Sequence, residues 1–110
     1  MADISGLLTI CRKAGKLVLG TDEVKNACRN GKALGVIVAK DFSEKSFKEI
    51  SFVCTNEGVP LYKSELSLND IGSALGKVYG VIAVTEAGFM KSFAKKLQKV
   101  ELPKPYDTFR

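Results

Sequence analysis

The sequence predicts an α/β fold in which a mixed sheet of four strands lies between two layers of helices, about five helices in all. Two observations predict this three-layer α-β-α sandwich. Short apolar runs alternate with amphipathic segments along the chain, as in proteins whose helices connect strands of one sheet. Two of these runs, 34–39 and 81–84, are apolar at every position, which indicates strands covered by helices on both faces.

The length and composition fit one compact domain. The chain has 110 residues, of which 45% are hydrophobic and 26% charged, so a single core is expected. We expect this domain to span residues 1–100. Residues 101–110 contain Pro103 and Pro105, which cannot continue a helix, and predict an extended C-terminal tail.

The first half of the chain is expected to hold three helices and two strands. Apolar residues at helical spacing predict a helix over 4–14, which Gly15 ends, and Leu17–Leu19 is a short strand. The next helix is expected to have Thr21 as its N-cap, acidic residues in its first turn and Asn30 at its end. The predicted strand over 34–39 leads to a helix over 41–56, with Asp41 as a candidate N-cap.

The second half continues the alternation. The predicted elements are a strand over 60–62, a helix from Ser67 to Leu75, a strand over 81–84 and a helix over 87–100. Ser67 with Asp70 three residues later is the pattern of a capping box. Gly72 and Gly76 are spaced by four among polar neighbours, which favours a helix packed close to the sheet over a membrane dimer motif.

The charge is unevenly distributed along the chain. Residues 1–40 carry seven basic and three acidic side chains, net +4, and residues 41–90 carry four basic and seven acidic ones, net −3. Residues 91–110 carry six basic and two acidic side chains, net +4. Segregated positive charge attracts polyanions such as nucleic acids, although solubilising lysines are an equally ordinary explanation.

The residue types exclude most catalytic chemistry. The chain has no His, which removes the usual acid–base catalyst, the usual activator of Ser or Cys nucleophiles and the commonest zinc ligand. Its three cysteines are odd in number and none are spaced C-x-x-C, which favours a reducing cytoplasm. The N-terminus lacks a secretory pattern, and no apolar run is long enough for a membrane span. We therefore expect a cytoplasmic, non-catalytic protein with no cofactor, metal, membrane or small-molecule substrate.

The segment from Arg12 to Glu23 is the most informative for binding. It places a helix N-terminus directly after a strand and Gly20, where free backbone N–H groups can meet a phosphate or a base edge. Carboxylates accept hydrogen bonds from bases, and nearby lysines neutralise phosphates. The basic residues around this segment in the sequence are Lys13, Lys16, Lys25, Arg29 and Lys32. From the residues alone, both an RNA contact and a plain capped helix remain open.

Several segments resemble the kink-turn RNA-binding ribosomal protein superfamily of the L-seven-Ae and L-thirty-e type. They include KAGKLVLGTDEV at 13–24, RNGKA at 29–33 and VIVAKD at 36–41, and three later segments match in order. These later segments are Gly58–Pro60, Ile71–Gly76 and Val81–Val84. The resemblance covers about residues 4–98 and is strongest to the short bacterial YlxQ-type branch. It implies a sandwich that grips sharply bent RNA, with structured, ribosomal or kink-turn-like RNA as partner and a ribosome-associated location.

Carried over by position, the resemblance also implies an RNA site. Gly20 and Thr21 offer backbone contacts, Glu23 accepts hydrogen bonds from sheared G·A bases, and Tyr79 stacks on an extruded base. The residues expected to contact RNA are Lys16, Gly20, Thr21, Asp22, Glu23, Lys25, Asn26, Arg29, Lys32, Lys40, Lys77, Val78 and Tyr79.

Two positions depart from the family pattern. The family's Asn is Asp22 here, and its Lys four residues later is Asn26. Both changes reduce positive charge toward RNA. The alternative function is therefore a protein–protein adaptor on the same fold that has lost kink-turn binding, with a ribosomal or other protein as partner.

Overall fold

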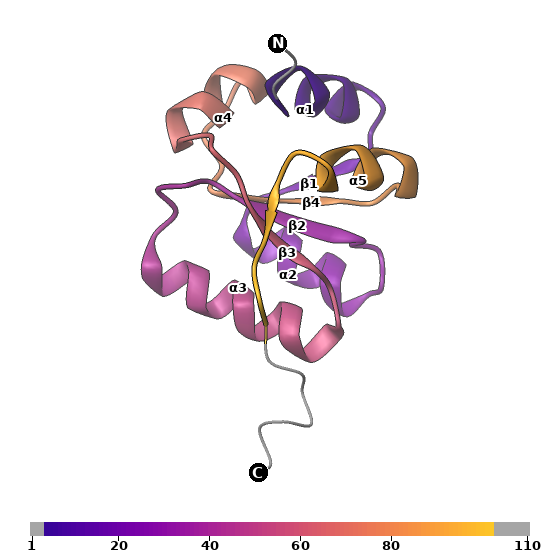
Figure 1. The fold of residues 1–110 in the computed structure, drawn as a ribbon, viewed down its shortest axis with the longest axis vertical. Helices are drawn as coiled ribbons and strands as arrows, with labels where there is room; N and C mark the ends of the chain where they lie inside the picture. Colours follow the sequence, from indigo (N-terminus) through magenta and orange to yellow (C-terminus); the bar gives the residue numbers. More distant parts are fainter. Residues whose placement is uncertain (1–3, 103–110) are drawn as a thin grey trace.

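The computed structural model describes residues 4–102, and its five helices and five strands form three layers (Figure 1). Helices α1 (Ile4–Lys13), α4 (Leu68–Leu75) and α5 (Ala87–Ala94) cover one face of the sheet, and α2 (Thr21–Arg29) and α3 (Glu44–Glu57) cover the other. The strands are β1 (Leu17–Leu19), β2 (Gly35–Val38), β3 (Leu61–Lys63), β4 (Val81–Val84) and β5 (Gln98–Lys99). The predicted α-β-α sandwich is confirmed. Within residues 4–102 there is no helix with the length and apolar character that crossing a membrane requires.

The sheet is mixed, with strand order β1-β4-β2-β3-β5. Only the β2–β3 pair is parallel, and the other three pairs are antiparallel. The central strands β2 and β4 are buried at every position, as their uniformly apolar sequences predict. Their side chains alternate between two cores. Val36 and Val38 pack toward α2 and α3, whereas Ile37 and Ile82 pack toward α1, α4 and α5.

The prediction of four strands was one strand short. The last helix, expected to reach Val100, ends at Ala94, and Gln98–Lys99 form β5, antiparallel to β3. The Val100 N–H donates to the Leu61 carbonyl at 2.8 Å, so β5 and Val100 cover backbone groups at the β3 edge. The helical spacing of Phe89, Phe93 and Leu97 favoured a longer helix, and both residues of β5 are exposed, so this short strand has no apolar alternation that would indicate it. The predicted tail lies outside the described residues except for Glu101 and Leu102.

Of the three predicted helix N-caps, two were wrong and one was confirmed, and Asn30 lies at the end of α2 as predicted. Gly20, with φ 96°, occupies the N-cap of α2, so Thr21 is already the first helical residue. Ser43 caps α3, while the Asp41 carboxylate accepts a hydrogen bond from the Leu68 N–H at 2.8 Å. A capping side chain with a long-range partner has no signature in the local sequence. The capping box of Ser67 and Asp70 at the start of α4 is present as predicted.

Candidate nucleic-acid interface

The sheet topology brings three predicted segments to one end of the sheet, at the left of Figure 1. Because β1 and β4 are antiparallel with Leu19 opposite Ile82, the end of β1 lies beside the beginning of β4. The Gly20 N–H donates to the Val81 carbonyl at 3.3 Å, and the Ala39 N–H donates to the Gly80 carbonyl at 2.9 Å. The start of α2, the loop 77–80 and Lys40 therefore adjoin one another, and we call their surface the 20/80 surface.

The beginning of α2 presents backbone and acidic groups on this surface. Gly20 forms no side-chain cap to the helix, which leaves the first backbone N–H groups of α2 available to a ligand. Asp22 and Glu23 are exposed, whereas Val24 is fully buried and anchors the helix to the sheet. The arrangement combines donors at the positive end of a helix dipole with two carboxylate acceptors.

Two glycines position the loop 77–80 on the 20/80 surface. A Cβ atom at Gly72 of α4 would lie 2.9 Å from Val78 Cγ2, and one at Gly80 would lie 2.3 Å from Phe42 Cδ1. Gly72 therefore permits close approach of the loop rather than of the sheet, which corrects the sequence interpretation. Val78 is 59% exposed and Tyr79 is half-buried against the α1, α4 and α5 core. The loop thus offers an exposed apolar tip.

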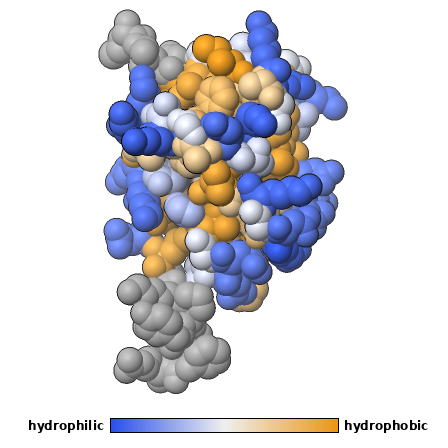
Figure 2. All heavy atoms as spheres, turned by 90° about the vertical axis from the view of Figure 1, so that its right-hand side faces the viewer, coloured by the Kyte–Doolittle hydropathy of each residue, from blue (hydrophilic) through white to orange (hydrophobic). Residues whose placement is uncertain are grey.

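Three of the predicted basic contacts lie at the opposite end of the sheet. The Lys16 carbonyl accepts from the Thr85 N–H at 3.0 Å, which places Lys16 at the far ends of β1 and β4. Arg29 ends α2, and Lys32 follows it in the turn that leads into β2. Figure 2 faces this end and shows hydrophilic residues on both sides of a hydrophobic strip. The structure therefore separates Lys16, Arg29 and Lys32 from the 20/80 surface.

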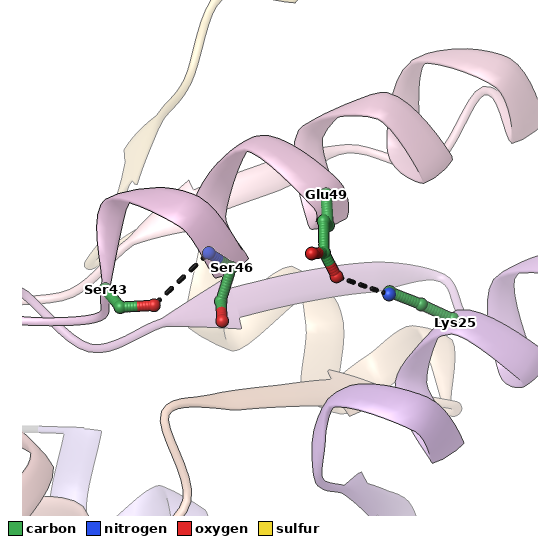
Figure 3. A network of polar contacts seen from close by, with 4 residues as sticks. All are labelled: Lys25, Ser43, Ser46 and Glu49. Carbon is green, nitrogen blue, oxygen red and sulfur yellow. Dashed lines mark hydrogen bonds and ion pairs between the residues drawn. The ribbon is translucent and has the colours of Figure 1, made fainter.

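The middle of α2 carries the remaining predicted residues. Asn26 is exposed. Lys25 forms an ion pair with Glu49 of α3 at 2.8 Å, with 19% of its side chain exposed (Figure 3). The hydrogen bond from Lys25, together with its positive charge, holds the pKa of Glu49 below its usual range. Lys25 is therefore tied to α3 rather than free at the sheet end.

Sequence reasoning missed two residues that build the interface. The Phe42 ring lies against Gly80, and Asp41 ties the segment after β2 to the start of α4. Both lie within four residues after the end of β2, and their position after a buried strand was the only signal in the sequence. Neither residue's partner is close in the sequence.

The fold and this surface define the class of protein. Residues 2–94 match the Ribosomal protein L7Ae/L30e/S12e/Gadd45 family, and the chain belongs to that family. The resemblance noted in the sequence is thereby confirmed at the level of the family.

Individual relatives show which members of the family this chain resembles. The chain is 36% identical over 84 residues to RNA-binding protein YlxQ of Bacillus subtilis, covering 76% of this chain and 83% of that protein. It is 28% identical to large ribosomal subunit protein eL30 of Saccharomyces cerevisiae, covering 77% of this chain and 83% of that protein. A solved structure of a protein with unknown function from Bacillus halodurans C superimposes with a TM-score of 0.79 at 28% identity, covering 86% of this chain and 96% of that one.

Proposed function

We propose that this protein is a non-catalytic, ribosome-associated RNA-binding protein that binds structured RNA of the ribosomal or kink-turn kind through the 20/80 surface. The observation that carries the proposal is the convergence of the α2 start, the loop 77–80 and Lys40 at one end of the sheet. The names of the relatives, an RNA-binding protein and a ribosomal protein, support the same ligand class.

Each part of the surface has a chemical task in this proposal. The N–H groups of Thr21 and its neighbours donate to phosphate or base acceptors, and the Glu23 carboxylate accepts from base amino and imino groups. Val78 and Tyr79 cover a base that is extruded from the bent helix. Lys40 and Lys77 neutralise phosphates, which is the main source of affinity for a polyanion.

Asp22 and Asn26 adjust this surface. A carboxylate at Asp22 keeps a hydrogen-bond acceptor beside Glu23 but adds a negative charge, which lowers the attraction for phosphate. Asn26 is exposed one turn further along α2 and carries an amide donor in place of a positive charge. We therefore expect this protein to bind a kink-turn more weakly than a chain with Asn at position 22 and Lys at position 26 would. The Asp22→Asn substitution should strengthen that binding.

A direct titration tests the proposal. A kink-turn RNA and a straight duplex of equal length are compared at two salt concentrations, using the wild type, Glu23→Ala and Glu57→Ala. Glu57 is an exposed carboxylate at the end of α3, so Glu57→Ala makes the same charge change away from the 20/80 surface. We expect preference for the kink-turn, weakened by Glu23→Ala and retained by Glu57→Ala.

Other results would lead to different conclusions. Equal, salt-sensitive binding to both RNAs would mean that the surface reads charge and not the bent shape. An absence of binding to either RNA would refute the proposal and favour the adaptor function on the same fold.

A further inference from the structure

A second surface lies between α2 and α3, on the face of the sheet that they cover. Both helices begin at the end of the sheet that carries the 20/80 surface and run away from it side by side (Figure 1). Between them is an open groove of about 350 Å³, lined by Lys25, Arg29, Lys48, Glu49, Phe52 and Val53. That volume is in the range of sites for small organic groups.

The charged side chains that line the groove differ in how closely they are paired with an opposite charge. Lys25 and Glu49 form one ion pair, in which the two side chains point toward each other across the helices (Figure 3). Lys48 lies 3.8 Å from Glu44, and both of those side chains are more than three-quarters exposed, so water screens their attraction. The Arg29 side chain is also exposed. The open part of the groove therefore has excess positive charge, which complements an anion.

Phe52 adds a feature that folding does not explain. Its side chain is 67% exposed, more than any other large hydrophobic residue in the described range 4–102. Its neighbours Val53 and Cys54 are buried and supply the contacts of α3 with the core. An exposed aromatic ring beside cationic side chains is the arrangement on which single-stranded nucleic acids stack their bases.

We propose that the α2/α3 groove binds one unpaired RNA nucleotide, whose base stacks on Phe52 and whose phosphate is held by Arg29 and Lys48. The proposal deepens the proposed function by extending its RNA footprint. Along α2, Arg29 lies about 12 Å beyond Thr21, since each helical residue rises about 1.5 Å. A single strand that leaves RNA bound at the 20/80 surface can therefore enter the groove.

The test uses the whole protein and a fluorescently labelled octauridine, followed by fluorescence anisotropy at low salt. Phe52→Ala is expected to lower the affinity about 5- to 150-fold, the range for loss of one stacked base. Phe52→Tyr retains a ring and should retain the affinity. Ile10→Ala is the matched control, because it removes another exposed apolar side chain, one on α1 that is 59% exposed. Photocrosslinking with a 5-bromouridine oligonucleotide should attach RNA to the α3 segment that contains Phe52.

The outcomes separate this proposal from the proposed function. Octauridine binding that is lost in Phe52→Ala and kept in Glu23→Ala supports the groove, whatever happens to kink-turn binding. Wild-type affinity in Phe52→Ala overturns it. Equal competition by an oligoglutamate peptide of the same charge also overturns it, because the groove would then be a contact for an acidic protein.

Discussion

The two ends of the sheet provide a comparison that tests the proposed RNA-binding surface. Lys40→Ala with Lys77→Ala removes two positive charges near the 20/80 surface, and Lys16→Ala with Lys32→Ala removes two at the opposite end. All four side chains are exposed, so neither double variant disturbs the core. The net charge changes equally in both proteins. A difference in RNA binding therefore depends on where the charges lie.

The expected magnitude follows from the phosphate contacts and the distance between the ends. Two lost phosphate contacts should reduce the slope of log affinity against log salt by about 1.8, at about 0.9 per contact. Between about 50 and 200 mM salt, the wild type should then lose about 12-fold more affinity than the Lys40 and Lys77 double variant. Lys16 is about 13 Å along β1 from Gly20, too far for its ammonium to contact a phosphate held at the 20/80 surface, and the slope counts such contacts. The opposite-end variant should keep the wild-type slope.

The assay is the kink-turn RNA titration repeated at four or more salt concentrations for the three proteins. Circular dichroism and unfolding midpoints should confirm that both variants are folded. A slope change in the Lys16 and Lys32 variant as large as that in the Lys40 and Lys77 variant would refute the assignment of the face. If the slope changed only in the Lys16 and Lys32 variant, the RNA would bind at the opposite end of the sheet and not at the 20/80 surface.

Four further predictions concern the fold, the loop and a buried thiol. Phe93→Ala should lower the free energy of unfolding by about 3 to 5 kcal/mol in urea denaturation, because the side chain is fully buried. Gly80→Ala should weaken kink-turn binding without abolishing folding, since the new Cβ would lie 2.3 Å from an aromatic ring atom that supports the loop. Hydrogen bonds from the Ser67 N–H and hydroxyl hold the pKa of Asp70 below its usual range. The ionised carboxylate therefore adds to the free energy of unfolding above about pH 4, and this contribution is lost as the pH falls further. Urea denaturation of Asp70→Asn should not show that loss. Burial raises the pKa of Cys11 to about 11, so iodoacetamide at about pH 8 should alkylate this thiol only in denaturant.

Much of the fold could be predicted because its signals are local. The apolar runs of β2 and β4, the helical spacing of α1 and the capping box of Ser67 each depend on residues within a few positions of one another. The end of α5 could not be predicted in this way. Its correct limit depends on the pairing of β5 with β3, about 35 residues earlier in the sequence, and side-chain periodicity carries no information about that partner.

The candidate site was predicted only in part, because its segments have local signals but the contacts between the segments do not. The helix start after Gly20 and the loop 77–80 were identified as separate segments, and the β1–β4 register brings them together. The basic residues were grouped by their closeness in sequence, which failed for Lys16 and Arg29. A strand or helix carries the chain across the whole sheet, so residues at its two ends face different surfaces.

The sequence by itself determined the helices and strands of residues 4–102 except for β5 and the end of α5, that helices cover both faces of the sheet, and that histidine chemistry is absent. Only the tertiary structure decided which cations are free, because Lys25 is held by Glu49, 24 positions away. It also decided that Phe52 faces solvent between α2 and α3 while Phe93 is fully buried. Local preferences select secondary structure, whereas the packing of distant elements selects the neighbours and exposure of each side chain.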